Sequence, residues 1–333
     1  MASRDHPNPS GIVAIGASAG GIDALQRLMR DLPAHIPAAI CVVLHIPASS
    51  HSLLAQIIAR QTRLPVSQAV TGERLRAAHV YVAPPDCHLR VGAGHVRLDR
   101  GPKENGVRPA IDPLFRSIAE ECGDRGLAVV LSGSLSDGAA GAAAVAAANG
   151  AVLVQDPEDA IVPSMPEAAL AAVPGAAAHT AEELTHEIAR RVAAFADAGP
   201  EEAPMSVHDR VAGAREHVSG APSGLTCPEC HGPLWERRSG AVVRYRCRVG
   251  HVFSEDVLLD GKGAAVEAAL WMALEALEER GELLEKVAVR IAAQGREDTA
   301  MRLRERARGA AQRAELIRGV LTVDETAAVS VSP

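Results

Sequence analysis

Short apolar runs alternate with amphipathic stretches from the N-terminus to about Ala198. Nearly continuous apolar runs at 12–15, 39–44 and 127–131 are typical of strands that are buried on both faces. The stretch from Ile22 to Leu32 instead repeats its apolar residues at helical spacing. Strands that alternate with helices in this way form parallel sheets. We therefore expect residues 1–198 to fold as an α/β domain with a doubly wound, mostly parallel sheet.

The pattern changes after this first domain. Residues 199–224 are rich in Pro, Ala, Gly, Ser and Glu without sustained periodicity, which indicates a linker. Residues 225–256 form a small hairpin-like segment that contains clustered cysteines. Apolar residues recur at helical spacing over 262–322, with a break at Gly295, and this predicts a helical hairpin. Residues 323–333 have no such pattern, and we expect a disordered tail.

Composition narrows the classes of protein to which the chain can belong. It has 333 residues, of which 47% are apolar but only 2% aromatic, so Ala, Val, Leu and Ile must fill the core. A net charge of −7 argues against nucleic-acid binding. The N-terminus is polar, and no apolar run is long enough to span a bilayer. We expect a cytoplasmic protein that is not an integral membrane protein; the scattered Cys41, Cys87 and Cys122 fit a reducing compartment.

Three chemically distinct side chains follow three of the predicted strands. Ser18 lies in the glycine-rich turn Gly16-Ala17-Ser18-Ala19-Gly20-Gly21, His45 directly follows the second apolar run, and Asp137 lies in the loop after a third. Ligands of α/β sheets bind outside the carboxyl ends of the strands, so these side chains can meet in one crevice. A serine, a histidine and an aspartate together supply a nucleophile, its general base and a group that orients the base.

Each of these residues also has a simpler interpretation. Ser18 and Asp137 are suitable helix N-caps, and a lone histidine at a strand end is more often structural than catalytic. The turn also resembles a dinucleotide-binding loop, but Ser18 occupies the position where that loop needs its second glycine. His45 likewise stands where a ribose-binding carboxylate would be required. The nucleophile and the cap remain open for Ser18 taken alone.

Several further stretches, taken in order with these three, resemble the catalytic domain of the chemotaxis receptor methylesterases, the CheB family. The resemblance runs from about Ile12 to Arg191, and its additional matches are Gly72-Glu73-Arg74, Tyr81-Val82-Ala83-Pro84-Pro85-Asp86 with His88, Arg108-Pro109, Asp112, Leu114-Phe115 and Met165-Pro166-Glu167-Ala168. It implies hydrolysis of glutamate methyl esters on the helical bundles of chemoreceptors, and deamidation of certain receptor glutamines. It also implies that Ser18, His45 and Asp137 form the catalytic triad, with no cofactor needed for chemistry.

The chain departs from this family in several respects, two of which bear directly on function. The family stretch before the catalytic aspartate resembles T-G-M-G-x-D-G, and Ser132, Ser134 and Leu135 replace its threonine, methionine and second glycine. The methionine helps to shape the oxyanion region in the family. Family members usually also carry a receiver domain, whereas the first strand here is predicted near residue 12, so no receiver is expected. The alternative function is a non-catalytic adaptor that keeps the fold.

Four side chains after the linker form two closely spaced pairs of metal ligands: Cys227 and Cys230, then Cys247 and His251. Two such pairs joined by a hairpin, with its turn at Ser239-Gly240, are typical of a tetrahedral zinc site. His231 competes as a ligand but directly follows Cys230, where it is poorly placed to close the site. Free buried cysteines are the alternative, although so small a core hardly folds without a cross-link. We expect a structural zinc in a zinc-ribbon-like module over 225–256.

The C-terminal half has no other recognisable chemistry. A flexible linker would let the zinc module stay near a receptor while the first domain engages a receptor helix, so we expect this half to tune targeting or access rather than catalysis. The helical hairpin offers a surface for a partner protein or for self-association as a short coiled coil.

Overall fold

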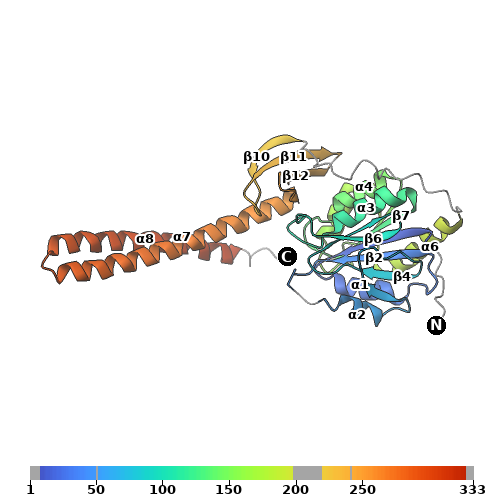
Figure 1. The fold of residues 1–333 in the computed structure, drawn as a ribbon, viewed down its shortest axis with the longest axis horizontal. Coiled ribbons are helices and arrows are strands. Elements are labelled where there is room, and N and C mark those ends of the chain that lie inside the picture. The colour runs from blue at the N-terminus through green and yellow to red at the C-terminus, as the bar shows by residue number, and fades with distance from the viewer. Residues whose placement is uncertain (1–7, 50–51, 198–219, 241, 328–333) are drawn as a thin grey trace. The chain divides into compact units, whose positions relative to one another are not determined.

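The computed structural model describes residues 8–49, 52–197, 220–240 and 242–327 (Figure 1). The chain divides into two compact units, Met1–Leu258 and Leu259–Pro333, and each is described by itself. Among the described residues, no helix combines the length and the apolar character needed to cross a membrane.

A seven-stranded sheet forms the centre of the first unit, in the order β3-β4-β2-β1-β7-β8-β9. Every neighbouring pair in this sheet is parallel. The strands are β1 Gly11–Ala17, β2 Ala38–Leu44, β3 Val66–Gln68, β4 His79–Val82, β7 Gly126–Val130, β8 Ala151–Gln155 and β9 Ala177–His179. The antiparallel pair β5 His88–Gly92 and β6 His95–Asp99 forms a separate hairpin. The α/β class and the mostly parallel sheet that the sequence predicts are confirmed.

Helices cover both faces of the sheet, so the fold is doubly wound (Figure 1). One face packs against α1 Gly21–Arg30, α2 Leu54–Ala59 and α6 Ala181–Asp197. The other packs against α3 Ile111–Cys122, α4 Ala139–Ala147 and α5 Ser164–Ala172. A single 3₁₀ turn, η1 Gly123–Arg125, joins α3 to β7.

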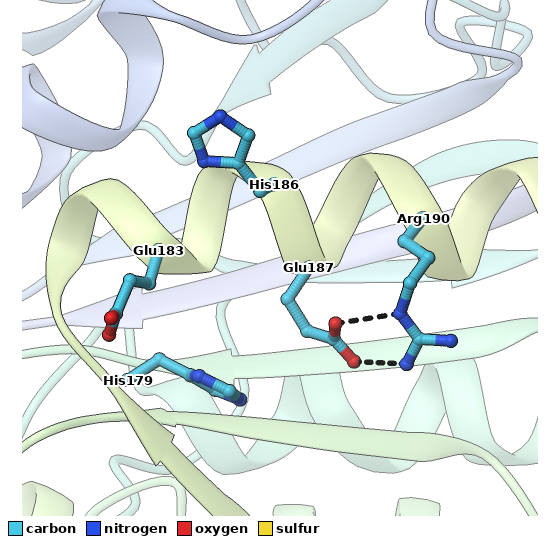
Figure 2. Close-up of a pocket in the computed structure, with 5 residues that line it drawn as sticks. All are labelled: His179, Glu183, His186, Glu187 and Arg190. Carbon is cyan, nitrogen blue, oxygen red and sulfur yellow. Dashed lines mark hydrogen bonds and ion pairs between the residues drawn. The ribbon is translucent and has the colours of Figure 1, made fainter.

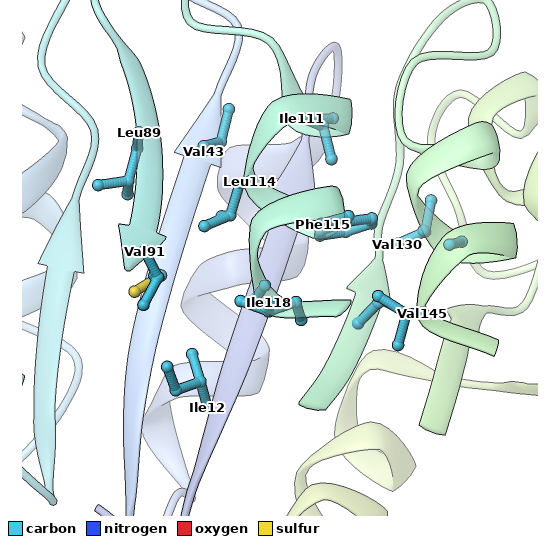
Figure 3. Packing of buried hydrophobic residues seen from close by; sticks show 14 of the residues in the cluster. Ile12, Val43, Leu89, Val91, Ile111, Leu114, Phe115, Ile118, Val130 and Val145 are labelled. Atoms are coloured by element: carbon cyan, nitrogen blue, oxygen red, sulfur yellow. The ribbon is translucent and has the colours of Figure 1, made fainter. Parts of the chain in front are cut away.

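The central strands supply side chains to both hydrophobic cores. In β1, Ile12 belongs to the core under α3, and Val13 belongs to the core under α1. Figure 3 shows the first of these cores, where Leu114 and Phe115 of α3 face the sheet. Successive residues of a strand point to opposite faces, which explains why these strands are apolar without interruption.

A small antiparallel sheet follows the described part of the first domain, in the order β10-β11-β12-β13. Its strands are β10 Ala221–Thr226, β11 Pro233–Ser239, β12 Val242–Cys247 and β13 Val252–Ser254. Strand β10 therefore begins inside the stretch predicted as linker, of which 199–219 lies outside the described residues. We refer to residues 221–258 as the ribbon module. Its core is small and consists of Cys227, Leu234, Tyr245, Cys247, Phe253, Val257 and Leu258.

The C-terminal residues form two long helices, α7 Glu255–Ala292 and α8 Glu297–Ala327. They are joined at Gly295, whose φ of +75° suits glycine. Leu274 of α7 packs with Ala314 and Leu321 of α8. Helix α7 begins before the predicted start at 262, because its first turn contributes Val257 to the ribbon core. The predicted tail is helical up to Ala327, and 328–333 lies outside the described residues.

Candidate active site

The three strands that precede the predicted triad residues are neighbours, in the order β2-β1-β7. The chain crosses from β1 to β2 on one side, and it reaches β7 on the other side of β1 only later. A ligand crevice forms where the strand order reverses in this way. Parallel neighbours lie about 4.8 Å apart, so side chains at their carboxyl ends come within contact distance. The topology thus brings Ser18, His45 and Asp137 together.

Ser18 lies on a tight turn between β1 and α1. Its amide donates a hydrogen bond to the carbonyl of Ser132 at 2.9 Å, which ties the turn to the loop after β7. A Cβ built on Gly133 of that loop would lie 2.8 Å from the Ser18 Cβ, so a side chain there would displace the serine. The N-cap of α1 is Gly20, with a φ of +74°, and no side chain caps this helix. The cap interpretation of Ser18 is therefore wrong.

A continuous hydrogen-bonded chain links the three side chains. The Oγ of Ser18 lies 3.0 Å from Nδ1 of His45, and Nε2 of His45 lies 2.7 Å from Oδ2 of Asp137. The ionised carboxylate accepts only, so Nε2 carries the proton and Nδ1 presents its lone pair to Ser18. The side chain of His45 is 14% exposed and that of Asp137 is 3% exposed. The imidazole is thus accessible from the crevice, while the carboxylate bonded to it is buried.

Asp137 is held as an anion. Burial raises the pKa of its carboxyl, but the hydrogen bond and charge of His45, together with the Ile111 and Asn105 donors, lower it to a net value below the usual range. The amide of Ile111 donates to Oδ2 at 2.6 Å. This amide belongs to the first turn of α3, where the helix dipole favours an anion. Asp137 therefore caps α3, a helix distant in sequence.

Asn105 is a site residue that the sequence analysis missed. It is 6% exposed, and its Nδ2 donates to Oδ1 of Asp137 at 2.9 Å. It lies in an irregular stretch and has a φ of +51°, a conformation that asparagine tolerates better than most residues. An asparagine in a loop is too common for its spacing to have indicated this role.

The turn that carries Ser18 also offers backbone donors. Within the described part of the chain, the amides of Ala19 and Gly20 make no backbone hydrogen bond, whereas the neighbouring amides of Ser18 and Gly21 do. They precede the N-terminus of α1, which begins at Gly21. Free amides at the start of a helix are suited to hold negative charge.

The four predicted metal ligands of the ribbon module converge. Their donor atoms all lie within 4.8 Å of one another. Cys230 Sγ lies 3.6 Å from Cys247 Sγ, and Nδ1 of His251 lies 3.5 Å from Cys247 Sγ. A tetrahedral zinc with ordinary bond lengths would separate its ligands by about 3.8 Å between sulfurs and about 3.6 Å between sulfur and nitrogen. The geometry therefore fits zinc, and burial lowers the pKa of His251, which favours the neutral ligand form.

The competing ligand His231 is not part of this group. Its residue has a φ of +57° and is exposed, and its amide donates to the carbonyl of Cys227. It belongs to the turn that brings Cys227 and Cys230 together.

A pocket separate from the crevice of Ser18 and His45 is lined by residues of α6 and β9, which Figure 2 shows. Glu187 is paired with Arg190 at 2.5 Å, which neutralises its charge. His186 leaves the helix on the opposite side from Glu183 (Figure 2). Among the described residues, only the ribbon group brings three or more metal-binding atoms together. The ionisable residues of this pocket therefore do not form a metal site.

Known proteins resemble the first domain in sequence and in fold. The model of the CheB methylesterase family matches residues 13–188. The crystal structure of the Thermotoga maritima CheB methylesterase catalytic domain is 33% identical, with a TM-score of 0.51, over 54% of this chain and 97% of that one.

Two curated relatives carry the same description, protein-glutamate methylesterase/protein-glutamine glutaminase. The one from Myxococcus xanthus is 39% identical over 190 residues, which make up 57% of this chain and 53% of that protein. The one from Pseudomonas aeruginosa is 41% identical over 163 residues, 48% of this chain and 46% of that protein. The chain thus spans about half the length of the curated relatives it matches. The family match covers more than half of the chain and includes all three triad positions, so the chain belongs to the CheB methylesterase family.

Proposed function

We propose that the chain is a serine hydrolase that removes methyl esters from glutamate side chains of chemoreceptors. The observation that carries this proposal is the hydrogen-bonded chain from Ser18 through His45 to Asp137. Relatives named protein-glutamate methylesterase/protein-glutamine glutaminase support the substrate class. The partner is then a methylated helical bundle of the chemoreceptor type.

The geometry assigns a role to each side chain. The Oγ of Ser18 attacks the ester carbonyl while Nδ1 of His45 accepts its proton. Asp137 keeps the proton on Nε2 of His45 and stabilises the imidazolium that forms. The same Nδ1 then protonates the departing methoxide, and methanol leaves.

The remaining steps use the same groups. The amides of Ala19 and Gly20 at the start of α1 stabilise the negative charge on the carbonyl oxygen. Water, activated by His45, then hydrolyses the acyl-enzyme and releases the glutamate carboxylate. A glutamine side chain would give the same acyl-enzyme once His45 has protonated the departing ammonia, so deamidation is a second activity of this site. Neither reaction needs a cofactor.

We assign a structural zinc to Cys227, Cys230, Cys247 and His251. Four protein ligands fill a tetrahedral coordination sphere and leave no position for a substrate. The zinc would cross-link the turns before β11 and β13, and it would supply folding free energy rather than chemistry.

The alternative is a non-catalytic adaptor, which the changed loop before Asp137 first suggested. Leu135, which replaces a family glycine, has a φ of +64° and packs against the core of the ribbon module. The replacement therefore has a packing explanation that does not require lost activity.

The experiment is a methanol-release assay on membranes that contain methylated chemoreceptors. We expect release from the intact chain and a loss of several orders of magnitude in Ser18→Ala, because each triad member is needed. Ser67→Ala is the matched control, since Ser67 lies on the outer strand β3 and bonds His79. If Ser18→Ala retained more than about a tenth of the activity, Ser18 would not be the nucleophile.

A further inference from the structure

The ribbon module packs directly on the part of the catalytic domain that holds the triad aspartate. A groove marks the seam, and its lining comes from both sides: Asp112, Ser136 and Ala139 from one, and Arg244, Ser254 and Asp256 from the other. The described contacts across this seam involve three parts of the catalytic domain. These are residues 103–105, Asp112 of α3 and the loop 135–137.

Asn105 connects the module to Asp137. On one side its Nδ2 donates to Asp137 Oδ1 at 2.9 Å. On the other side its Oδ1 accepts the amide of Ser254 at 3.0 Å, and its own amide donates to the carbonyl of Val252 at 2.7 Å. Strand β13 thus holds both the backbone and the side chain of Asn105. Each end of the Asn105 amide faces a partner of fixed polarity, so its orientation is determined.

A buried ion pair makes a second connection. Asp112 is 1% exposed, and it forms an ion pair with Arg244 of β12. The Asp112 oxygen that meets Arg244 also lies 3.3 Å from Nδ2 of Asn105. A buried carboxylate without its cation is strongly unfavourable, so the catalytic domain depends on Arg244 to keep this arrangement.

The loop that carries Asp137 is held from the module as well. Ser136, its immediate neighbour, bonds Ser254 Oγ at 2.9 Å and Asp256 Oδ1 at 2.7 Å. Leu135 packs against the ribbon core. Asp137 is therefore flanked on both sides, through Asn105 and through its own loop, by groups that the module fixes.

We propose that the ribbon module is a positioning element for the triad. Ser254 holds Asn105 and the loop of Asp137 directly, Arg244 acts on Asn105 through Asp112, and turnover requires the docked module. The inference rests on the proposed esterase activity and adds a dependence of that activity on this contact. Displacing a catalytic group by about 1 Å can cost about a hundredfold in rate. The expectation that the C-terminal half acts only by tethering does not fit these contacts.

The test uses the full chain and a small soluble activated ester, p-nitrophenyl acetate, which needs no receptor docking. Arg244→Met should lower kcat about tenfold or more with little change in KM, because the triad is misplaced while the crevice remains open. Arg244→Lys should retain more kcat than Arg244→Met because it keeps the charge beside Asp112. Arg238→Met is the matched control, since exposed Arg238 pairs with Glu236 on its own strand.

A double-mutant cycle separates positioning from general damage. Asn105→Ala should lower kcat by itself, and Arg244→Met should add little in that background, because both act through one connection. If circular dichroism shows that Arg244→Met is unfolded at the assay temperature, Ser136→Ala takes its place in the cycle. Ser136→Ala should then lower kcat several-fold.

The outcomes distinguish this inference from the proposed function. If Ser18→Ala abolishes ester turnover while the folded module variants keep the kcat of the intact chain, the positioning role is wrong and the esterase stands. Additive losses in the cycle, or equal losses in Arg244→Met and Arg238→Met, would also contradict it. If Ser18→Ala leaves turnover unchanged, it is the proposed function that fails.

Discussion

The catalytic sheet and the ribbon module are held together by different forces. The sheet is covered on both faces by large apolar cores, and all residues of β1, β2 and β7 are buried. The ribbon has one small core, in which two of the buried members, Cys227 and Cys247, are proposed zinc ligands. The first fold follows from hydrophobic burial, whereas the small core of the second is the reason we propose a zinc cross-link there.

Two buried carboxylates at the seam differ in which region supplies the groups that stabilise them. Asp137 is stabilised from within the catalytic domain by His45 and by the amide of Ile111. Asp112 obtains its positive partner, Arg244, from the module. The ribbon module therefore supplies a positive charge that balances a buried carboxylate of the catalytic domain.

Metal removal should have the largest effect, because it should unfold the ribbon module and leave the catalytic sheet folded. A structural zinc contributes on the order of 10 kcal/mol to the folding of a small module, so chelation should unfold the ribbon. Both tryptophans, Trp235 and Trp271, lie outside the catalytic sheet, and a Trp271→Phe chain would leave Trp235 of β11 as the only reporter. We expect a chelator to shift the emission of Trp235 to the red.

Metal analysis provides the control for that experiment. We expect about one zinc per chain after dialysis, and its loss in Cys227→Ser and Cys247→Ser, because one four-ligand site is present among the described residues. Zinc that is absent from the dialysed chain, or Trp235 emission that ignores its removal, would contradict the structural role.

Asp137→Asn should have the next largest effect, now on the catalytic side. The amide would donate to Nε2 of His45 and favour the tautomer with its proton on Nδ1, which cannot accept from Ser18. We expect kcat on a small ester to fall by about 10³–10⁴-fold. Asp156→Asn, at a loop position after β8, is the matched control. A loss of less than tenfold would remove Asp137 from the triad.

A core truncation should have the smallest of these effects. Leu28 of α1 is fully buried under the sheet, and Leu28→Ala should lower the free energy of unfolding by about 3–5 kcal/mol. Leu259, at the start of the second unit, is 75% exposed, and Leu259→Ala should change the free energy of unfolding by less than about 0.5 kcal/mol. Chemical denaturation followed by circular dichroism measures both. Equal effects would mean that the sheet does not dominate stability.

The sheet was predictable from local pattern, and the meeting of Ser18, His45 and Asp137 from simple topology, whereas their role as a triad came from the family resemblance. Uninterrupted apolar runs produced β1 and β2, and the carboxyl ends of parallel strands meet at one edge, which placed Ser18 beside His45. The spacing of cysteines and histidine likewise predicted four side chains that converge in the structure.

The seam was not predictable because it depends on docking between distant, irregular segments. Asn105 and Ser254 are ordinary polar residues in the sequence, and only the packed structure makes them partners. The start of α7 was placed too late because its first turn is stabilised by the ribbon core rather than by its own periodicity. Asp137 was considered as a cap for its own helix, whereas it caps α3.

Labelling with a serine-reactive fluorophosphonate, followed by mass spectrometry of the adduct, shows whether Ser18 is an activated nucleophile. Such a probe reacts with a serine only where a general base activates it. We expect one phosphonylated residue, Ser18, with labelling lost in His45→Ala and strongly slowed in Arg244→Met. An unlabelled intact chain, or an adduct on another serine, would mean that Ser18 is not an activated nucleophile.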